Sequence, residues 1–289
     1  MPDYRIKSVH AVQVQSRRHN MAVSARVETM DGAVGKALCY AGVSVGTHEV
    51  HFQYDGGNRW GGLGCMSAVR NVNTIIADTI LGMDVRNQFE IDQAMLSIQG
   101  NGSASVGGNA IAAVSAAVLK AGAAATQMPL YRYIGGENAC MLPVPGAPAF
   151  SGGERWGGAV HTHGNKPTGA FQCFGYDSFS EASSAAWDMY HLFAKELEKR
   201  GVTEGDWFFY RIPAGIFKHS DEELFELMAD VIHKTGNDGK AGIQIDVAAD
   251  CYYDRNHKRY RGLFSKEERD RDQLLAYYLK LIDTYPFVS

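Results

Sequence analysis

The sequence predicts an α+β domain followed by an incomplete α/β barrel. Residues 5–15, 23–29 and 33–40 have strand patterns and are followed by helical patterns, which is typical of an α+β unit. Further along the chain, short apolar runs alternate with amphipathic segments that begin at capping signals, which is typical of an α/β barrel. We therefore expect one domain at 1–138 and a second at 139–289.

The first domain is expected to open with a three-stranded antiparallel meander. Asp31-Gly32 lies between its second and third strands and is a hairpin signal. The apolar spacing then predicts helices at 67–81, 85–98, 108–126 and 129–134. The third of these is apolar nearly all round, so we expect it to be buried between layers.

The second domain is expected to follow the order β-β-α-α-β-α. Strands are predicted at the entry of this domain and near 170–174, with a glycine-rich loop at 151–169 between them. Three Ser-x-x-Glu capping boxes, which begin at Ser178, Ser220 and Ser265, predict the starts of three helices.

A short apolar run at 243–247 predicts the third strand of this domain, buried and parallel. The last three residues have the pattern of another strand. Three such strands are less than half a barrel and leave unpaired edges, so we expect a homo-oligomer or a partner chain that completes the barrel.

Asp246 lies near the C-terminal end of this third strand. A buried carboxylate needs a partner, and the C-terminal ends of barrel strands face the active site. Two interpretations follow from the residues alone: Asp246 is a metal ligand, or it is a structural acid in a salt bridge.

Composition excludes several classes of protein. The 289 residues carry a net charge of -4 and are 45% hydrophobic, which suits a soluble globular protein and gives no sign of nucleic-acid or membrane binding. The five cysteines are scattered without a C-x-x-C pair, as expected for free thiols in the cytoplasm. The most apolar long run, Ala110 to Leu119, is too short to span a bilayer.

Several motifs, in the right order, resemble the enolase (phosphopyruvate hydratase) family of glycolysis. The loop Gly42–Glu49 is similar to the family's S-G-A-S-T-G-x-H-E, and Val69–Ala77 is similar to V-x-N-V-N-x-I-I-A. Leu142-Pro143-Val144-Pro145 matches outright, Ile245–Ala249 resembles the metal-binding strand, and Tyr285–Ser289 resembles Y-P-I-V-S. The resemblance implies an enolase N-terminal domain followed by the first part of the enolase barrel.

This resemblance also implies a chemistry. In the family, Mg²⁺ holds the carboxylate of 2-phosphoglycerate, a lysine removes a proton and a glutamate assists the leaving hydroxyl, which gives phosphoenolpyruvate. Carried over to this chain, Asp246 and Ser44 would bind metal, and Ser44 and Arg155 would bind substrate.

The match fails at the acids. Phe171-Gln172-Cys173-Phe174 has Cys173 where the family's F-Q-E-F has glutamate, and Trp207 stands in place of the family's second glutamate, that of G-D-E-G-G. No catalytic residue is therefore assigned. The family's other metal-binding acids and its lysines would lie beyond Ser289. Binding of Mg²⁺ is expected to be weak.

We expect a non-catalytic or partner-dependent member of the family. One alternative is an active lyase on a phosphorylated or carboxylate substrate with rearranged acids, and another is an N-terminal piece of an ordinary enolase. Two local alternatives also stay open: His161 and His163 as a replacement ligand pair, and Cys173 as a new nucleophile.

Overall fold

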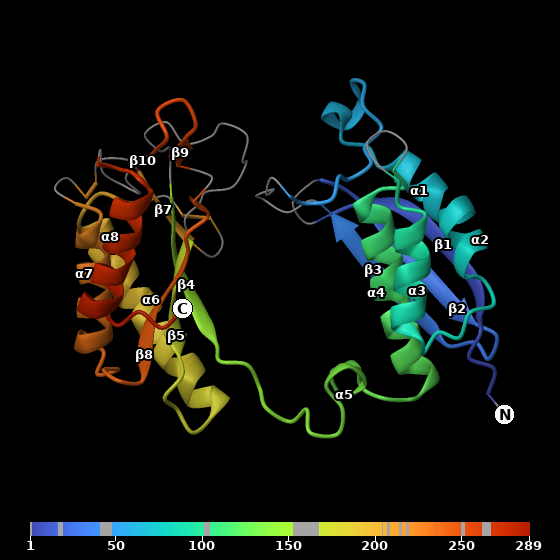
Figure 1. Cartoon of the computed structure of the whole chain (residues 1–289). Helices are drawn as coiled ribbons and strands as arrows, with labels where there is room; N and C mark the ends of the chain where they lie inside the picture. Colours follow the sequence, from blue (N-terminus) through green and yellow to red (C-terminus); the bar gives the residue numbers. More distant parts are fainter. Residues whose placement is uncertain are drawn as a thin grey trace. The chain divides into compact units, whose positions relative to one another are not determined.

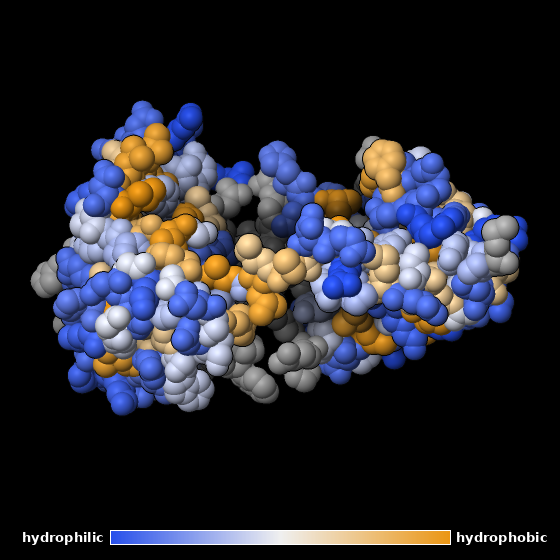
Figure 2. All heavy atoms as spheres, turned by 90° about the horizontal axis from the view of Figure 1, so that it is seen from below, coloured by the Kyte–Doolittle hydropathy of each residue, from blue (hydrophilic) through white to orange (hydrophobic). Residues whose placement is uncertain are grey.

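The chain folds into two compact units that divide between Cys140 and Met141. This computed structural model describes residues 2–16, 20–40, 48–100, 105–152, 168–203, 205–206, 209–213, 216–217, 220–249, 252–261 and 267–289. The segment that follows α5 (Leu130–Gly135) and joins the units exposes apolar side chains, with Met141 93% and Leu142 68% exposed. Figure 2 shows apolar surface over this segment.

A three-stranded antiparallel sheet in the order β1-β2-β3 forms the base of the first unit (Figure 1). The strands are β1 (Ile6–Gln15), β2 (Met21–Thr29) and β3 (Val34–Tyr40). Their alternation of buried and exposed residues follows the pleat, because successive side chains point to opposite faces. The predicted meander is confirmed.

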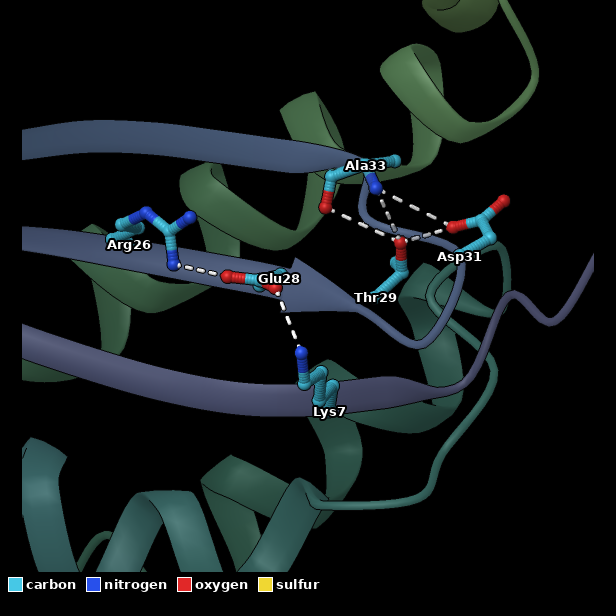
Figure 3. Close-up of polar contacts among 6 residues, drawn as sticks. All are labelled: Lys7, Arg26, Glu28, Thr29, Asp31 and Ala33. Carbon is cyan, nitrogen blue, oxygen red and sulfur yellow. Dashed lines mark hydrogen bonds and ion pairs between the residues drawn. The ribbon is translucent and has the colours of Figure 1, made fainter.

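The turn between β2 and β3 also agrees with its sequence signal. Gly32 has a φ of +89°, a conformation that glycine adopts without strain, and Thr29 Oγ1 accepts a hydrogen bond from the Ala33 amide at 2.9 Å (Figure 3). On the outward face of the sheet, Glu28 forms ion pairs with Lys7 and Arg26 at 3.2 and 2.7 Å. These two cations lower the pKa of Glu28.

Helices cover the other face of this sheet. The elements that follow β3 in this unit are η1 (Arg59–Gly62), α1 (Met66–Asn71), η2 (Val72–Ile76), α2 (Ala77–Ile80), α3 (Gln88–Ser97), α4 (Gly108–Ala125) and α5 (Leu130–Gly135), and of these α1, η2, α2 and α4 contact the sheet. The helix predicted at 67–81 is present, and it contains a π-helical turn, η2, that the apolar spacing did not reveal. Asp55 accepts hydrogen bonds from the Met66 and Ser67 amides and so caps α1.

Helix α4 is the central helix of the first unit. It is long and apolar enough to cross a membrane by length and composition, but 56% of it is buried and it packs against β2, β3 and α3. This is the packing of a core helix, as predicted. Its contact with β3 is so close that a Cβ added at Gly35 would lie 2.0 Å from the carbonyl oxygen of Ala117.

The second unit contains a five-stranded sheet in the order β6-β7-β4-β5-β8. Its strands are β4 (Gly146–Gly152), β5 (Thr168–Cys173), β6 (Gly205–Asp206), β7 (Phe209–Ile212) and β8 (Ala241–Asp246). Strand β5 runs antiparallel to both of its neighbours, β4 and β8, whereas β4 and β7 are parallel.

The prediction that 243–247 forms a parallel strand, in a run of three parallel-type strands, is therefore wrong for its pairing with β5. Strand β5 runs opposite to both β4 and β8, and a short apolar run predicts a buried strand but not the direction of its neighbour. On its other side β8 does have a parallel neighbour. The Ile243 amide donates to the Pro286 carbonyl at 2.7 Å, and the Val288 amide donates to Ile243 at 3.0 Å.

Helices α6 (Phe179–Glu198), α7 (Glu222–Lys234) and α8 (Arg271–Thr284) share one hydrophobic core with a single face of this sheet. A small sheet, β11-β10-β9, lies beside α8 and was not predicted; its strands are Glu268–Arg269, Arg259–Arg261 and Tyr253–Asp254. Strands β6 and β7 were not predicted either. These five strands, β6, β7, β9, β10 and β11, have between two and four residues each. They are too short to show the alternation of apolar and polar residues that predicts a strand.

One of the three predicted capping boxes marks its helix start correctly. Ser178 accepts a hydrogen bond from the Glu181 amide and begins α6. The second is half formed: Glu223 accepts a hydrogen bond from the Ser220 amide at 3.3 Å, although α7 begins one residue later than predicted, at Glu222 after Asp221. The third was misplaced, because α8 begins after Asp270, which forms a complete capping box with Gln273. At α8 an aspartate that lies closer to the amphipathic stretch outweighs the Ser-x-x-Glu spacing.

Candidate functional site

Three polar residues lie in register at one end of the five-stranded sheet. Ser151 on β4 is opposite Thr168 on β5, and Thr168 is opposite Asp246 on β8. We call these three residues the polar row. Because β5 is antiparallel to its neighbours, the start of β5 meets the ends of β4 and β8 there. On the far side of β4, the backbone of Arg211 on β7 is opposite Ser151.

The polar row lies on the face of the sheet that is turned away from α6, α7 and α8. Residues directly opposite in a ladder share a face, and faces alternate along a strand. Phe171 and Ile243 are opposite each other and fully buried under the helices. Thr168 and Asp246 are each three residues away from this pair, so they take the other face, where they are half-buried.

Cys173 lies far from the polar row along the strand, and it lies on the opposite face of the sheet. It is opposite Ala241, at the other end of the β5–β8 ladder, and it is buried in the core beneath α6. Burial raises the pKa of its thiol to about 11, so the sulfur is protonated at neutral pH. The interpretation of Cys173 as a nucleophile is therefore wrong, and the structure does not bring Cys173 to Asp246 as a substitute for an acid.

The donor set of the polar row is compatible with Mg²⁺ in type. It offers one carboxylate and two hydroxyls, and Mg²⁺ prefers oxygen ligands. Among the residues that the structure describes, no three His, Cys, Asp or Glu side chains come together as a metal cluster. Asp246 would hold the ion here, and with a single carboxylate most of the other positions would fall to water.

The comparisons with protein families match almost the whole chain. Residues 6–134 match the model of the enolase N-terminal domain, and residues 139–289 match that of the enolase C-terminal TIM barrel domain. The chain belongs to the enolase family. The resemblance found in the motifs is thus confirmed, as is the fold class: an α+β domain with a three-stranded meander, followed by part of an enolase-type barrel.

Individual relatives agree with the family models. The chain is similar to proteins named enolase from Bifidobacterium longum subsp. infantis, at 37% identity over 98% of this chain, and from Methanopyrus kandleri, at 37% over 99%. An enolase from Campylobacter jejuni is 35% identical over 98% of the chain. The alignments cover 65%, 66% and 66% of these relatives, so the chain spans about two thirds of their length.

Several predicted site residues of this enolase-family chain lie outside the described residues: Ser44, Arg155, His161, His163 and Trp207. The structure thus places Asp246 and Cys173 from the predicted set and separates them. It adds Ser151 and Thr168, which sequence reasoning missed. No motif in the sequence marks these two residues. Their position follows from the antiparallel pairing of β5 with β4 and β8.

Proposed function

We propose that this enolase-family chain binds Mg²⁺ weakly through Asp246, together with a small phosphorylated acid, and does not catalyse the enolase reaction by itself. The polar row is the observation that carries this. An acid that acts beside a metal on Asp246 has to lie at the same end and on the same face of the sheet. The residue that β5 brings there is Thr168, and a threonine hydroxyl does not titrate near neutral pH.

The first test concerns the metal. Asp246→Ala is expected to remove Mg²⁺ binding, because it deletes the one carboxylate of the polar row. Isothermal titration with Mg²⁺ alone measures this, and Asp238→Ala is the control because Asp238 pairs with His233 on the surface. Unchanged Mg²⁺ affinity in Asp246→Ala would show that the ion, if bound, uses another site.

A partner segment is also part of the proposal. On α8, Leu275, Leu279 and Ile282 form a stripe at helical spacing and are 58%, 55% and 58% exposed. The residues after α8 add a parallel strand beside β8. In a barrel each strand and each outer helix has a neighbour on both sides, so a further βα segment, from a second copy or another chain, fits beside this strand and stripe.

We expect this chain to self-associate or to associate with such a partner. Light scattering at increasing protein concentration measures this, and Leu279→Glu should shift the mass toward the monomer because it places a charge within the stripe. The control is Phe89→Glu, which also replaces an exposed apolar side chain by a carboxylate. Phe89 belongs to the first unit and is 75% exposed. A monodisperse monomer at all concentrations would contradict self-association and leave a different partner chain as the alternative.

The proposed location is the cytoplasm. Four cysteines, Cys39, Cys65, Cys140 and Cys173, are free thiols among the described residues. Free thiols are typical of reducing compartments.

A further inference from the structure

Two glutamines lie on the same face of the sheet as Asp246. Gln244 precedes Asp246 by two residues on β8, and Gln172 is opposite Gly242 one step further from the polar row. Both side chains are half-buried. Gln172 Nε2 donates a hydrogen bond to Gln244 Oε1 at 3.4 Å, so the two amides form a pair across β5 and β8.

Small residues make room for this pair. A Cβ added at Gly146 on β4 would lie 2.9 Å from Gln172 Nε2, so the amide lies directly over that glycine. Ala170 is opposite Gln244 in the ladder, and Gly242 is opposite Gln172. The inward face of a barrel is normally filled by bulky branched apolar residues. Paired amides over Gly and Ala are not explained by apolar packing.

The pair orients the Gln244 amide. Its oxygen accepts from Gln172, and its NH₂ group is a donor that can bind an acceptor beside Asp246. Residues two apart on a strand are separated by about 7 Å. A three-carbon acid bound by a metal on Asp246 would therefore be within reach of that donor.

We propose that Gln244 binds the carboxylate of the small phosphorylated acid held at Asp246, and that Gln172 is its positioning residue. This inference rests on the proposed function and deepens it, since it names the group that is recognised. A neutral amide suits a carboxylate whose charge is already partly balanced by Mg²⁺, because the site gains a hydrogen bond without burying a second full charge.

Two probes test the proposal by titration calorimetry of the full chain at saturating Mg²⁺. One is 2-phosphoglycerate, and the other is glycerol 2-phosphate, which has a hydroxymethyl group in place of the carboxylate. The wild type should prefer 2-phosphoglycerate. Gln244→Leu should weaken binding of 2-phosphoglycerate about tenfold and leave glycerol 2-phosphate unchanged, because only the former loses a charge-assisted hydrogen bond. Gln244→Glu, of equal size, should weaken it further by repulsion.

Gln172→Leu is the matched control. It removes the same hydrogen bond within the pair but keeps the Gln244 amide, so the preference for 2-phosphoglycerate should fall less than in Gln244→Leu. Thermal unfolding shows whether each variant is folded, and titration with Mg²⁺ alone should give the wild-type affinity in the two leucine variants.

The outcomes separate the two proposals. If the wild type binds 2-phosphoglycerate with Mg²⁺ but Gln244→Leu keeps the full preference, the role of Gln244 is overturned while the proposed function stands. Equal losses in Gln172→Leu and Gln244→Leu would mean that the pair is structural. If the wild type binds no 2-phosphoglycerate, both proposals fail.

Discussion

The unmodified chain is expected to give no measurable conversion of 2-phosphoglycerate to phosphoenolpyruvate. Each general acid or base contributes roughly 10²–10⁴ to the rate. Where several groups act together, removing one of them costs about as much rate as removing them all. In the proposed function, the residue beside Asp246 in the polar row is Thr168, whose hydroxyl does not titrate near neutral pH, and the motif resemblance puts Trp207 in place of a glutamate. The measurement is the rise in ultraviolet absorbance of phosphoenolpyruvate with Mg²⁺ present.

The geometry also decides which variants are informative. Thr168→Glu puts a second carboxylate opposite Asp246, so it should tighten Mg²⁺ binding even if turnover stays undetectable. Cys173→Glu is the control: it places a carboxylate in the core under α6, so it should destabilise the fold and leave the metal affinity unchanged. Ready turnover by the unmodified chain would refute the non-catalytic proposal. Turnover of another phosphorylated acid or carboxylate would favour the rearranged lyase.

Gly35→Ala is expected to destabilise the first unit by about 3 kcal/mol or more. The added methyl would lie 2.0 Å from the Ala117 carbonyl oxygen and 2.3 Å from the Ala121 nitrogen. Both are backbone atoms of α4, so no side-chain rotation relieves the contact and the helix has to move away from β3. Urea unfolding followed by circular dichroism measures the loss.

The control for this change lies on the same hairpin. Gly32 has open space around its Cα, and Gly32→Ala should cost only about 1 kcal/mol, from its left-handed conformation. Equal losses in the two variants would mean that close packing of α4 on β3 is not what requires glycine at position 35.

Family and fold class were accessible from the sequence because they depend on local signals. The alternation of β1 to β3, the Asp31-Gly32 turn and the apolar spacing of α4 each lie within a short stretch. Motifs such as Leu142-Pro143-Val144-Pro145 carry the family without any knowledge of pairing. Helix starts were less secure, as Asp270 shows, because competing caps lie only a few residues apart.

The candidate site could be predicted only at Asp246. A sequence shows which residues share a strand face, but it does not show which strand is its neighbour, in which direction that neighbour runs or in which register. These relations separate Cys173 from Asp246 and bring Thr168 and Ser151 beside it. The sequence by itself therefore determined the family, the meander and the metal-binding candidate. Strand pairing, a long-range property of the folded chain, decided which side chains share the site.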